Sequence, residues 1–370
     1  MKNMQKKILI IYGTRPEIIK LAPLIISLKE KIGTSCIVVN TGQHADMTRE
    51  LEKIFSFTPD YFLDIMTQGQ SLNSLIVKAI REIDTVLEKE KPDTVIVQGD
   101  TTTVLAGGIA SYYRGIDVGH VEAGLRSFNM QEPYPEEFNR KVISIFAKYN
   151  FVPTEKAKEN LQKEQVLNDN IYITGNTVVD ALQLIKQKID KKEIETTVKT
   201  KHKQNILITA HRRENHGNGI ESICKAVKIL SEKYKEYNFY WPVHPSPKVY
   251  NTVHRLLANI DNVKLLPPLS YIDLIYLMTK SKIILTDSGG IQEEAPSVKK
   301  PVLILRNVTE RPEVIDAGFG KIVGTSVNKI VDTVKVLLKD DNVYKKMISG
   351  TNPFGDGKAS EKIINILLNE

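Results

Sequence analysis

The sequence predicts an α/β protein with two domains, each built on a parallel sheet. Short β-branched runs alternate with amphipathic stretches along the whole chain, as in strand–helix–strand units. Most of these runs are apolar throughout, which is typical of strands covered on both faces. The length of 370 residues suits two domains of ordinary size.

The expected strands form two series. In the first half they are 7–12, 36–40, 94–98, 118–121, 151–153 and 171–174. In the second half they are 206–209, 239–243, 263–265, 283–285, 302–305 and 321–323. Between strands, apolar residues from Leu72 to Leu87 recur at helical spacing, and Pro92 ends this helix soon after. The segment 186–203 is rich in Lys and Glu, and we expect it to be a solvated helix and loop that joins the domains.

The composition excludes several classes of protein. With 41% hydrophobic and 26% charged residues the chain is neither disordered nor fibrous. No apolar run approaches the roughly 18 residues of a membrane span, and the N-terminus lacks a signal-peptide pattern, so we expect a cytoplasmic protein without membrane insertion. Cys36 and Cys224 are expected to be buried free thiols.

The charge and the short motifs narrow the choice of ligand. The net charge of +7 suits an anionic small substrate as well as nucleic acid, but no basic block is interleaved with aromatic residues, so no nucleic-acid partner is expected. No dinucleotide fingerprint follows the first strand and no P-loop is present. No His, Cys and Asp set has metal-ligand spacing, and we predict no catalytic metal.

Polar and glycine-rich clusters follow the predicted strands. They are 13–15, 42–44, 99–103 and 120–124 in the first half, and 211–214, 244 and 286–290 in the second. In open α/β sheets ligands bind at the carboxyl ends of strands. The sequence therefore predicts a ligand site in a cleft between the domains, which His44 and His244 could help to line.

Several of these residues suit a phosphorylated ligand. Arg15 lies in a tight glycine turn with Lys20 one helical turn later, and His211 and Arg212 add a second cationic group. Cations from both halves predict a doubly charged anion in the cleft. Ser288, Gly289 and Gly290 are predicted to begin a helix, where free backbone N–H groups attract phosphate. An ordinary capped turn has the same sequence pattern. Glu294, one turn later, could hold a ribose.

Three carboxylates are candidates for proton transfer. Asp100, Glu122 and Glu136 lie on loops at one predicted sheet edge. Carboxylates that meet in a partly dry cleft can supply both an acid and a base. For Asp100 the alternative of a simple helix cap stays open.

The motifs together resemble the non-hydrolysing UDP-N-acetylglucosamine 2-epimerases. They are IYGTRPEIIKLAPL, TGQHADM, QGDTTTVLAG, HVEAGLRS, PYPEEFNR, TGNTVVDA, TAHRREN, VHPSP, LTDSGGIQEEAP, TERPE and NPFGDGKAS, and they span residues 13–360. The resemblance implies two Rossmann-like domains of the GT-B type that face a central cleft, in a homodimer. It also implies an N-terminal domain 1–175 joined by a C-terminal helix at about 356–370, and a UDP-binding domain 176–355.

The resemblance further implies an activity and roles for residues. Members of the family interconvert UDP-GlcNAc and UDP-ManNAc without NAD, by elimination and re-addition of UDP, and supply ManNAc for surface polysaccharides. Arg15, His211 and 288–290 match the diphosphate ligands of the family, and Glu294 matches its ribose ligand. Asp100, Glu122 and Glu136 match the carboxylates for proton transfer, and we group His211 with them as catalytic. Two further residues from the motifs, Gln43 and Arg311, complete the predicted substrate-binding set.

Other functions stay open at this point. A GT-B glycosyltransferase would share the fold and a UDP-sugar, and a sensor would bind the sugar without chemistry. An epimerase for a modified sugar, such as a 2,3-diacetamido uronic acid, is nearer, because the SFNM after GLR resembles that branch. The GTRPE and GDTTT motifs favour UDP-GlcNAc.

Overall fold

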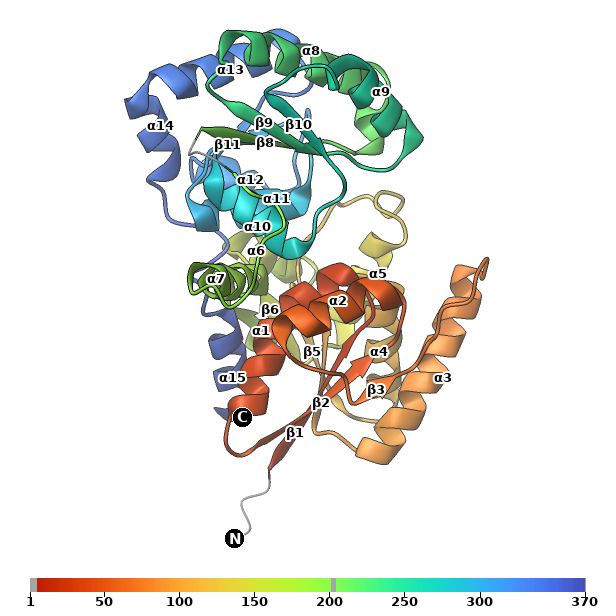
Figure 1. Ribbon diagram of the computed structural model, residues 1–370. Helices are drawn as coiled ribbons and strands as arrows, with labels where there is room; N and C mark the ends of the chain where they lie inside the picture. The colour runs from red at the N-terminus through yellow and green to blue at the C-terminus, as the bar shows by residue number, and fades with distance from the viewer. Residues whose placement is uncertain (1–4, 201–203, 370) are drawn as a thin grey trace. The chain divides into compact units, whose positions relative to one another are not determined.

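The computed structural model describes residues 5–200 and 204–369, and the chain divides into two compact units. Unit 1 comprises Met1–Ala181 and Phe354–Glu370, and unit 2 comprises Leu182–Pro353. Each unit has one parallel sheet with helices packed against it (Figure 1). The α/β class predicted from the strand–helix alternation is confirmed.

The sheet of unit 1 has seven strands in the order β3-β2-β1-β4-β5-β6-β7. Their bounds are β1 Lys6–Tyr12, β2 Thr34–Asn40, β3 Tyr61–Phe62, β4 Thr94–Gln98, β5 Asp117–Val121, β6 Tyr149–Val152 and β7 Ile171–Ile173. All neighbouring strands run parallel. The predicted strands of this half are present, with ends shifted by about one or two residues. The sequence pattern missed β3, because two residues are too few to show a period.

The helices of unit 1 alternate with these strands. They are α1 Arg15–Glu30, α2 Ala45–Phe55, α3 Leu72–Glu90, α4 Thr102–Tyr113, α5 Glu136–Phe146, α6 Glu155–Lys163 and α15 Ala359–Asn369, with a 3-10 turn at Asn168–Asn170. The predicted helix from Leu72 is α3. The C-terminal helix α15 packs against α1 (Figure 1). Its first turn is held by Asp180, whose carboxylate accepts hydrogen bonds from the backbone N–H groups of Ala359 and Ser360 at 3.3 and 2.8 Å.

The sheet of unit 2 has six strands in the order β10-β9-β8-β11-β12-β13, again all parallel. They are β8 Asn205–Thr209, β9 Asn238–Pro242, β10 Val263–Leu266, β11 Ser281–Thr286, β12 Val302–Ile304 and β13 Gly320–Ile322. The helices are α8 Asn218–Lys233, α9 Pro247–Leu257, α10 Tyr271–Lys280, α11 Gly289–Glu294, α12 Pro312–Asp316, α13 Val327–Lys339 and α14 Asp341–Ile348, with 3-10 turns at Arg213–Asn215 and Ala295–Val298. Every strand predicted for this half is present. Trp241, the single tryptophan of the chain, is fully buried in the core of this unit.

Two sequence expectations need correction. The segment 186–203 begins in a helix, α7 (Thr177–Asp190), as expected, but its remainder is not only a solvated loop. Thr197 and Val198 bond to the buried carboxylate of Asp273 in unit 2; residues 201–203 lie outside the described residues. Cys36 is a free thiol as expected, but it is only half-buried, because β3 pairs only with the end of β2. Cys224 is free and buried.

Because all strands within a sheet are parallel, their carboxyl ends lie at one edge of that sheet. In unit 1 the loops that begin at Gly13, Thr41, Gly99 and Glu122 follow β1, β2, β4 and β5. In unit 2 the residues that follow β8, β9 and β11 include His211, His244 and Asp287. Within the described part of the chain, no helix combines the length and apolarity that crossing a bilayer requires.

Candidate functional site

Arg15 begins α1 directly after the loop that follows β1. The loop approaches its neighbours closely: a Cβ at Gly13 would lie 2.1 Å from the Thr41 hydroxyl oxygen, so only glycine fits there. Thr14 and Glu17 form a capping box, in which Glu17 Oε2 accepts hydrogen bonds from the N–H groups of Gly13 and Thr14, both at 2.7 Å. The start of α1 is therefore held rigidly, and Arg15 stands half-buried on it.

Glu17 also links this loop to the loop after β4. The Thr101 hydroxyl donates to Glu17 Oε1, and Thr101 is the N-cap of α4. Burial raises the pKa of Glu17 to about 7, while the hydrogen bonds from Thr101, Gly13 and Thr14 oppose that shift. The Glu17 carboxylate thus connects Thr14, which precedes Arg15, with Thr101, which follows Asp100.

The predicted carboxylates Asp100 and Glu122 are joined by one guanidinium. Arg140 of α5 forms an ion pair with Asp100 Oδ2, and its other nitrogen lies 3.9 Å from Glu122 Oε1. Lys20 forms an ion pair with Glu122 Oε2, to which Asn176 Nδ2 also donates at 3.2 Å. Glu122 is 6% exposed, and a buried carboxylate needs such partners. The structure thus brings Asp100, Glu122 and the predicted ligand Lys20 into one charged cluster.

The alternative interpretation of Asp100 as a helix cap is wrong. The side chain that accepts from the start of α4 is that of Thr101, which bonds to the N–H of Val104. Asn139 donates to the Asp100 carbonyl at 2.8 Å, and the Asp100 carboxylate forms an ion pair with Arg140.

Glu136 is the first residue of α5, the helix that carries Arg140. Residues four apart share a helix face, so Glu136 lies one turn before Arg140 on the same face. Its Oε2 is buried with no hydrogen-bond partner among the described residues. The structure does not include Glu136 in the bonds of the Asp100–Glu122 cluster.

Gln43 and His44 follow β2 at the same edge of the sheet. Gln43 Oε1 accepts a hydrogen bond from Thr103 at 2.9 Å, and Thr103 also lies 3.0 Å from the Thr41 hydroxyl. His44 is exposed, and its backbone N–H donates to the Gly13 carbonyl at 2.7 Å. Both residues therefore lie beside the loop that precedes Arg15.

In unit 2, His211 and Arg212 belong to the loop after β8 and are half-buried. Their backbone N–H groups both donate to Asp287 Oδ2 at 2.9 Å. The ring of His244, which is exposed, stacks on the ring of His211 with centroids 5.5 Å apart. Burial is the main cause that lowers the pKa of His211, and the nearby Asp287 opposes it.

Ser288, Gly289 and Gly290 follow β11, and Gly289 begins the short helix α11. The Arg311 guanidinium carbon would lie 3.3 Å from a Cβ at Gly289, so glycine is what allows this close approach. Arg311 is held there by Glu293, a carboxylate that is 1% exposed, at 2.8 Å.

Glu294 ends α11 and is buried. The Tyr271 hydroxyl donates to Glu294 Oε1 at 3.0 Å. A predicted ribose ligand is therefore positioned by a phenol from α10.

Sequence reasoning missed the residues that hold the candidates in place. They are Glu17, Arg140, Asn176, Tyr271 and Glu293; Asp287 lies in the predicted cluster 286–290, but no role was predicted for it. A local signal existed for Glu17, because Thr14-x-x-Glu17 is the capping-box spacing. Arg140, by contrast, is 40 positions from Asp100, and no local pattern pairs them.

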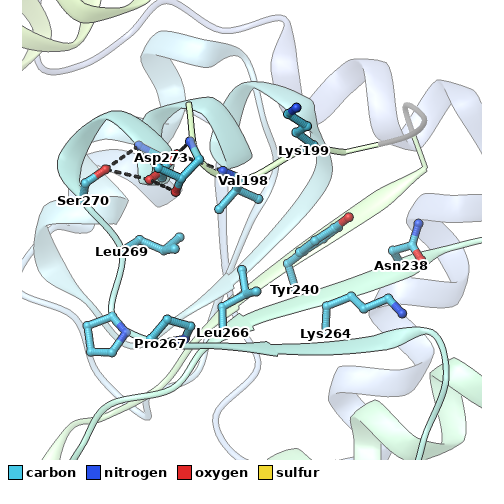
Figure 2. A pocket seen from close by; sticks show the side chains of 12 residues that line it. Val198, Lys199, Asn238, Tyr240, Lys264, Leu266, Pro267, Leu269, Ser270 and Asp273 are labelled. Carbon is cyan, nitrogen blue, oxygen red and sulfur yellow. Dashed lines mark hydrogen bonds between the residues drawn. The ribbon is translucent and has the colours of Figure 1, made fainter. Parts of the chain in front are cut away.

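One pocket of unit 2 does not include the predicted site residues. It has a volume of about 810 Å³ and is lined by 197–199, Asn238, Tyr240, Lys264 and 266–270 with Asp273 (Figure 2). None of the predicted site residues lines it. We assign the candidate site from the charged groups at the strand ends, because chemistry depends on those groups rather than on the size of a hollow. No group of three His, Cys, Asp or Glu side chains in the described ranges is arranged to hold a metal ion.

Known proteins are similar to this chain in sequence and in fold. The family model for UDP-N-acetylglucosamine 2-epimerase matches residues 27–368. A UDP-N-acetylglucosamine 2-epimerase of Campylobacter jejuni is 45% identical, over 99% of this chain and 98% of its own. The crystal structure of UDP-GlcNAc 2-epimerase from Neisseria meningitidis bound to UDP-GlcNAc has a TM-score of 0.89 at 43% identity, over 98% of this chain and 100% of that chain. MurG from Acinetobacter baumannii, at 15% identity and a TM-score of 0.64, shares the fold alone.

The two parallel α/β sheets and these structural likenesses define an enzyme of the GT-B type of fold. The family follows from the match over nearly the whole chain. The chain belongs to the UDP-N-acetylglucosamine 2-epimerase family, and the resemblance that its motifs carry is confirmed.

Proposed function

We propose that the protein catalyses the reversible epimerisation of UDP-GlcNAc to UDP-ManNAc at C2, by elimination and re-addition of UDP. The observation that carries the proposal is the cluster of Asp100 and Glu122 with Arg140 and Lys20 at the strand ends of unit 1. Glycosyl transfer requires a base to deprotonate the acceptor and a sensor requires none, whereas epimerisation requires both an acid and a base at C2. Family membership supports the substrate.

The chemistry explains why elimination comes first. The C2 hydrogen of the sugar has no adjacent carbonyl, so direct deprotonation is difficult. Departure of UDP from C1 builds positive charge there and makes the C2 hydrogen more acidic. The leaving diphosphate gathers negative charge, which fixed cations and backbone N–H groups stabilise.

We assign cationic residues to the binding of the leaving group. Arg15, His211 and Arg311 are proposed to bind the diphosphate together with the backbone of 288–290, and Glu294 the ribose. The support is that two of these side chains are held by neighbours: Arg311 by Glu293, and Glu294 by Tyr271. The remaining predicted ligands, Lys20, Gln43, His44, Arg212 and His244, are proposed to surround the substrate.

Epimerisation needs proton removal on one face of the sugar and delivery on the other. More than one acid or base is therefore required, and we propose Asp100, Glu122 and Glu136 for these steps. Elimination and re-addition of UDP oxidise no atom at any step, so the proposed mechanism does not require NAD, and we propose no metal. We further propose that the enzyme works as a homodimer in the cytoplasm and supplies ManNAc units for surface polysaccharide.

Incubation of the purified protein with UDP-GlcNAc in heavy water, followed by proton NMR, tests the proposal. The expected product is UDP-ManNAc with deuterium at C2, formed without an acceptor, NAD or metal. Conversion with the C2 hydrogen retained would contradict proton exchange with solvent. Turnover that requires a sugar acceptor would show a glycosyltransferase instead.

A further inference from the structure

We propose that Asp287 is a positioning residue for His211, which it holds with Nδ1 protonated so that Nε2 is left for the ligand. The inference rests on the proposed function, which makes His211 a ligand of the diphosphate. Neither the sequence motifs nor the likeness to known proteins assigns a role to Asp287.

One carboxylate oxygen of Asp287 holds the backbone of the loop. The residue follows β11 directly and is fully buried. Its Oδ2 accepts three hydrogen bonds at 2.9 Å, from the N–H groups of His211 and Arg212 and from Nδ2 of Asn215. Its own N–H donates to the Thr209 carbonyl at 3.1 Å, which continues the pairing of β8 with β11. The start of the His211 loop is thereby tied to the sheet.

The other oxygen points to a role beyond loop support. Oδ1 is buried without a hydrogen-bond partner among the described residues, and it lies 3.4 Å from Nδ1 of His211. A buried carboxylate oxygen without a donor is costly. The imidazole can remove this cost by placing its proton on Nδ1. The tautomer then leaves Nε2 to meet an anion once the ring is protonated.

A second buried aspartate in the same unit shows what purely structural support looks like. Asp273 is 3% exposed, and both of its oxygens are bonded (Figure 2). Oδ1 accepts from the N–H groups of Thr197 and Val198, and Oδ2 accepts from the hydroxyls of Thr197 and Ser270. Asp287 differs from it by one unsatisfied oxygen that lies beside an imidazole.

The charges around His211 give this oxygen an electrostatic effect. Burial lowers the pKa of His211, and His244, Arg212 and His216 lower it further. Asp287 acts in the opposite sense and raises it. Without the Asp287 charge, His211 would be harder to protonate when the negative charge of the leaving group develops.

The test uses Asp287→Asn, with Asp273→Asn as the matched control. If the side-chain oxygen of the introduced asparagine keeps the three loop donors, the NH₂ group of its amide faces Nδ1 of His211. It then imposes the opposite tautomer, with the proton on Nε2. In a catalytic triad this kind of change lowers turnover by about 10⁴-fold while the geometry is kept. We expect kcat/KM of Asp287→Asn to fall at least tenfold. The acid limb of its profile of kcat/KM against pH should move to lower pH. Asp273→Asn should leave the shape of the pH profile unchanged.

NMR of ¹⁵N-labelled histidine in the ligand-free protein supplies the independent measurement, with His211→Gln used to assign the signal. We expect the Nδ1–H tautomer in the wild type at high pH, and a lower titration midpoint for His211 in Asp287→Asn. An Nε2–H tautomer in the wild type would overturn the proposal, even if the variant did not fold. An unchanged midpoint in a folded variant would also overturn it. A shifted midpoint with normal turnover would support the positioning and contradict the role of His211 in the proposed function.

Discussion

Replacing Glu17 by alanine tests whether this buried carboxylate holds the loop that precedes Arg15. Three donors lose their acceptor: the N–H groups of Gly13 and Thr14, both 2.7 Å from Oε2, and the hydroxyl of Thr101. Each buried donor left without an acceptor costs about 1–3 kcal/mol. At the low end of that range, the free energy of unfolding of unit 1 falls by about 3 kcal/mol. For a domain of roughly 200 residues this lowers Tm by about 6–12 °C.

Glu17→Gln is the matched variant, because its amide oxygen can accept from Gly13 and Thr14 while its NH₂ donates to Thr101. It should lose much less stability than Glu17→Ala. It also removes a titrating group. Burial raises the pKa of Glu17 from an ordinary 4.5 to about 7, so the folded state keeps this proton to a higher pH than the unfolded state. The stability of the wild type relative to Glu17→Gln is therefore greatest below pH 4.5 and is lost as the pH rises towards 7.

Scanning calorimetry at pH 5 and pH 8 measures both effects. Calorimetry is preferable to fluorescence, because the single tryptophan, Trp241, lies in unit 2. If Glu17→Ala melts within about 2 °C of the wild type, the carboxylate does not hold the loop. If the wild type and Glu17→Gln respond equally to pH, the argument from the buried charge is wrong.

Three further predictions concern single residues. Glu122→Gln should lower turnover by about 10²–10⁴-fold, while UDP affinity measured by calorimetry stays unchanged. If turnover falls only a few-fold, Glu122 has a structural role. Arg15→Ala should weaken UDP binding by about 10–100-fold, since a hydrogen bond to a charged group contributes about 1.5–3 kcal/mol. Arg114 is exposed, and Arg114→Ala, which removes the same charge, should leave UDP affinity unchanged. If both variants lose the same affinity for UDP, the effect comes from net charge alone. Gly124→Ala should destabilise more than Gly115→Ala in urea unfolding. Both have positive φ, but a Cβ at Gly124 would lie 2.3 Å from a backbone oxygen of α6, while Gly115 has open space; equal losses would refute the steric argument.

The architecture follows from local sequence to a large extent. Apolar β-branched runs predict buried parallel strands, and the spacing from Leu72 to Leu87 predicts α3, because both patterns reflect which faces are covered. The two-residue β3 carries no such period. The docking of Thr197 on Asp273 could not be predicted either, since it joins residues 76 positions apart in a segment of ordinary polar composition.

The sequence by itself determined the two α/β sheets, the loops at their strand ends and the residue types on those loops. Asp100, Glu122, Arg15 and His211 could be named in this way, because a polar cluster after an apolar strand is a local pattern. Only the tertiary structure decided which groups these residues meet. The link from Glu17 to Thr101 spans 84 positions, and it exists because parallel strands that are distant in the chain end side by side. Pairing of this kind depends on sheet order and helix packing, which no short stretch of sequence encodes.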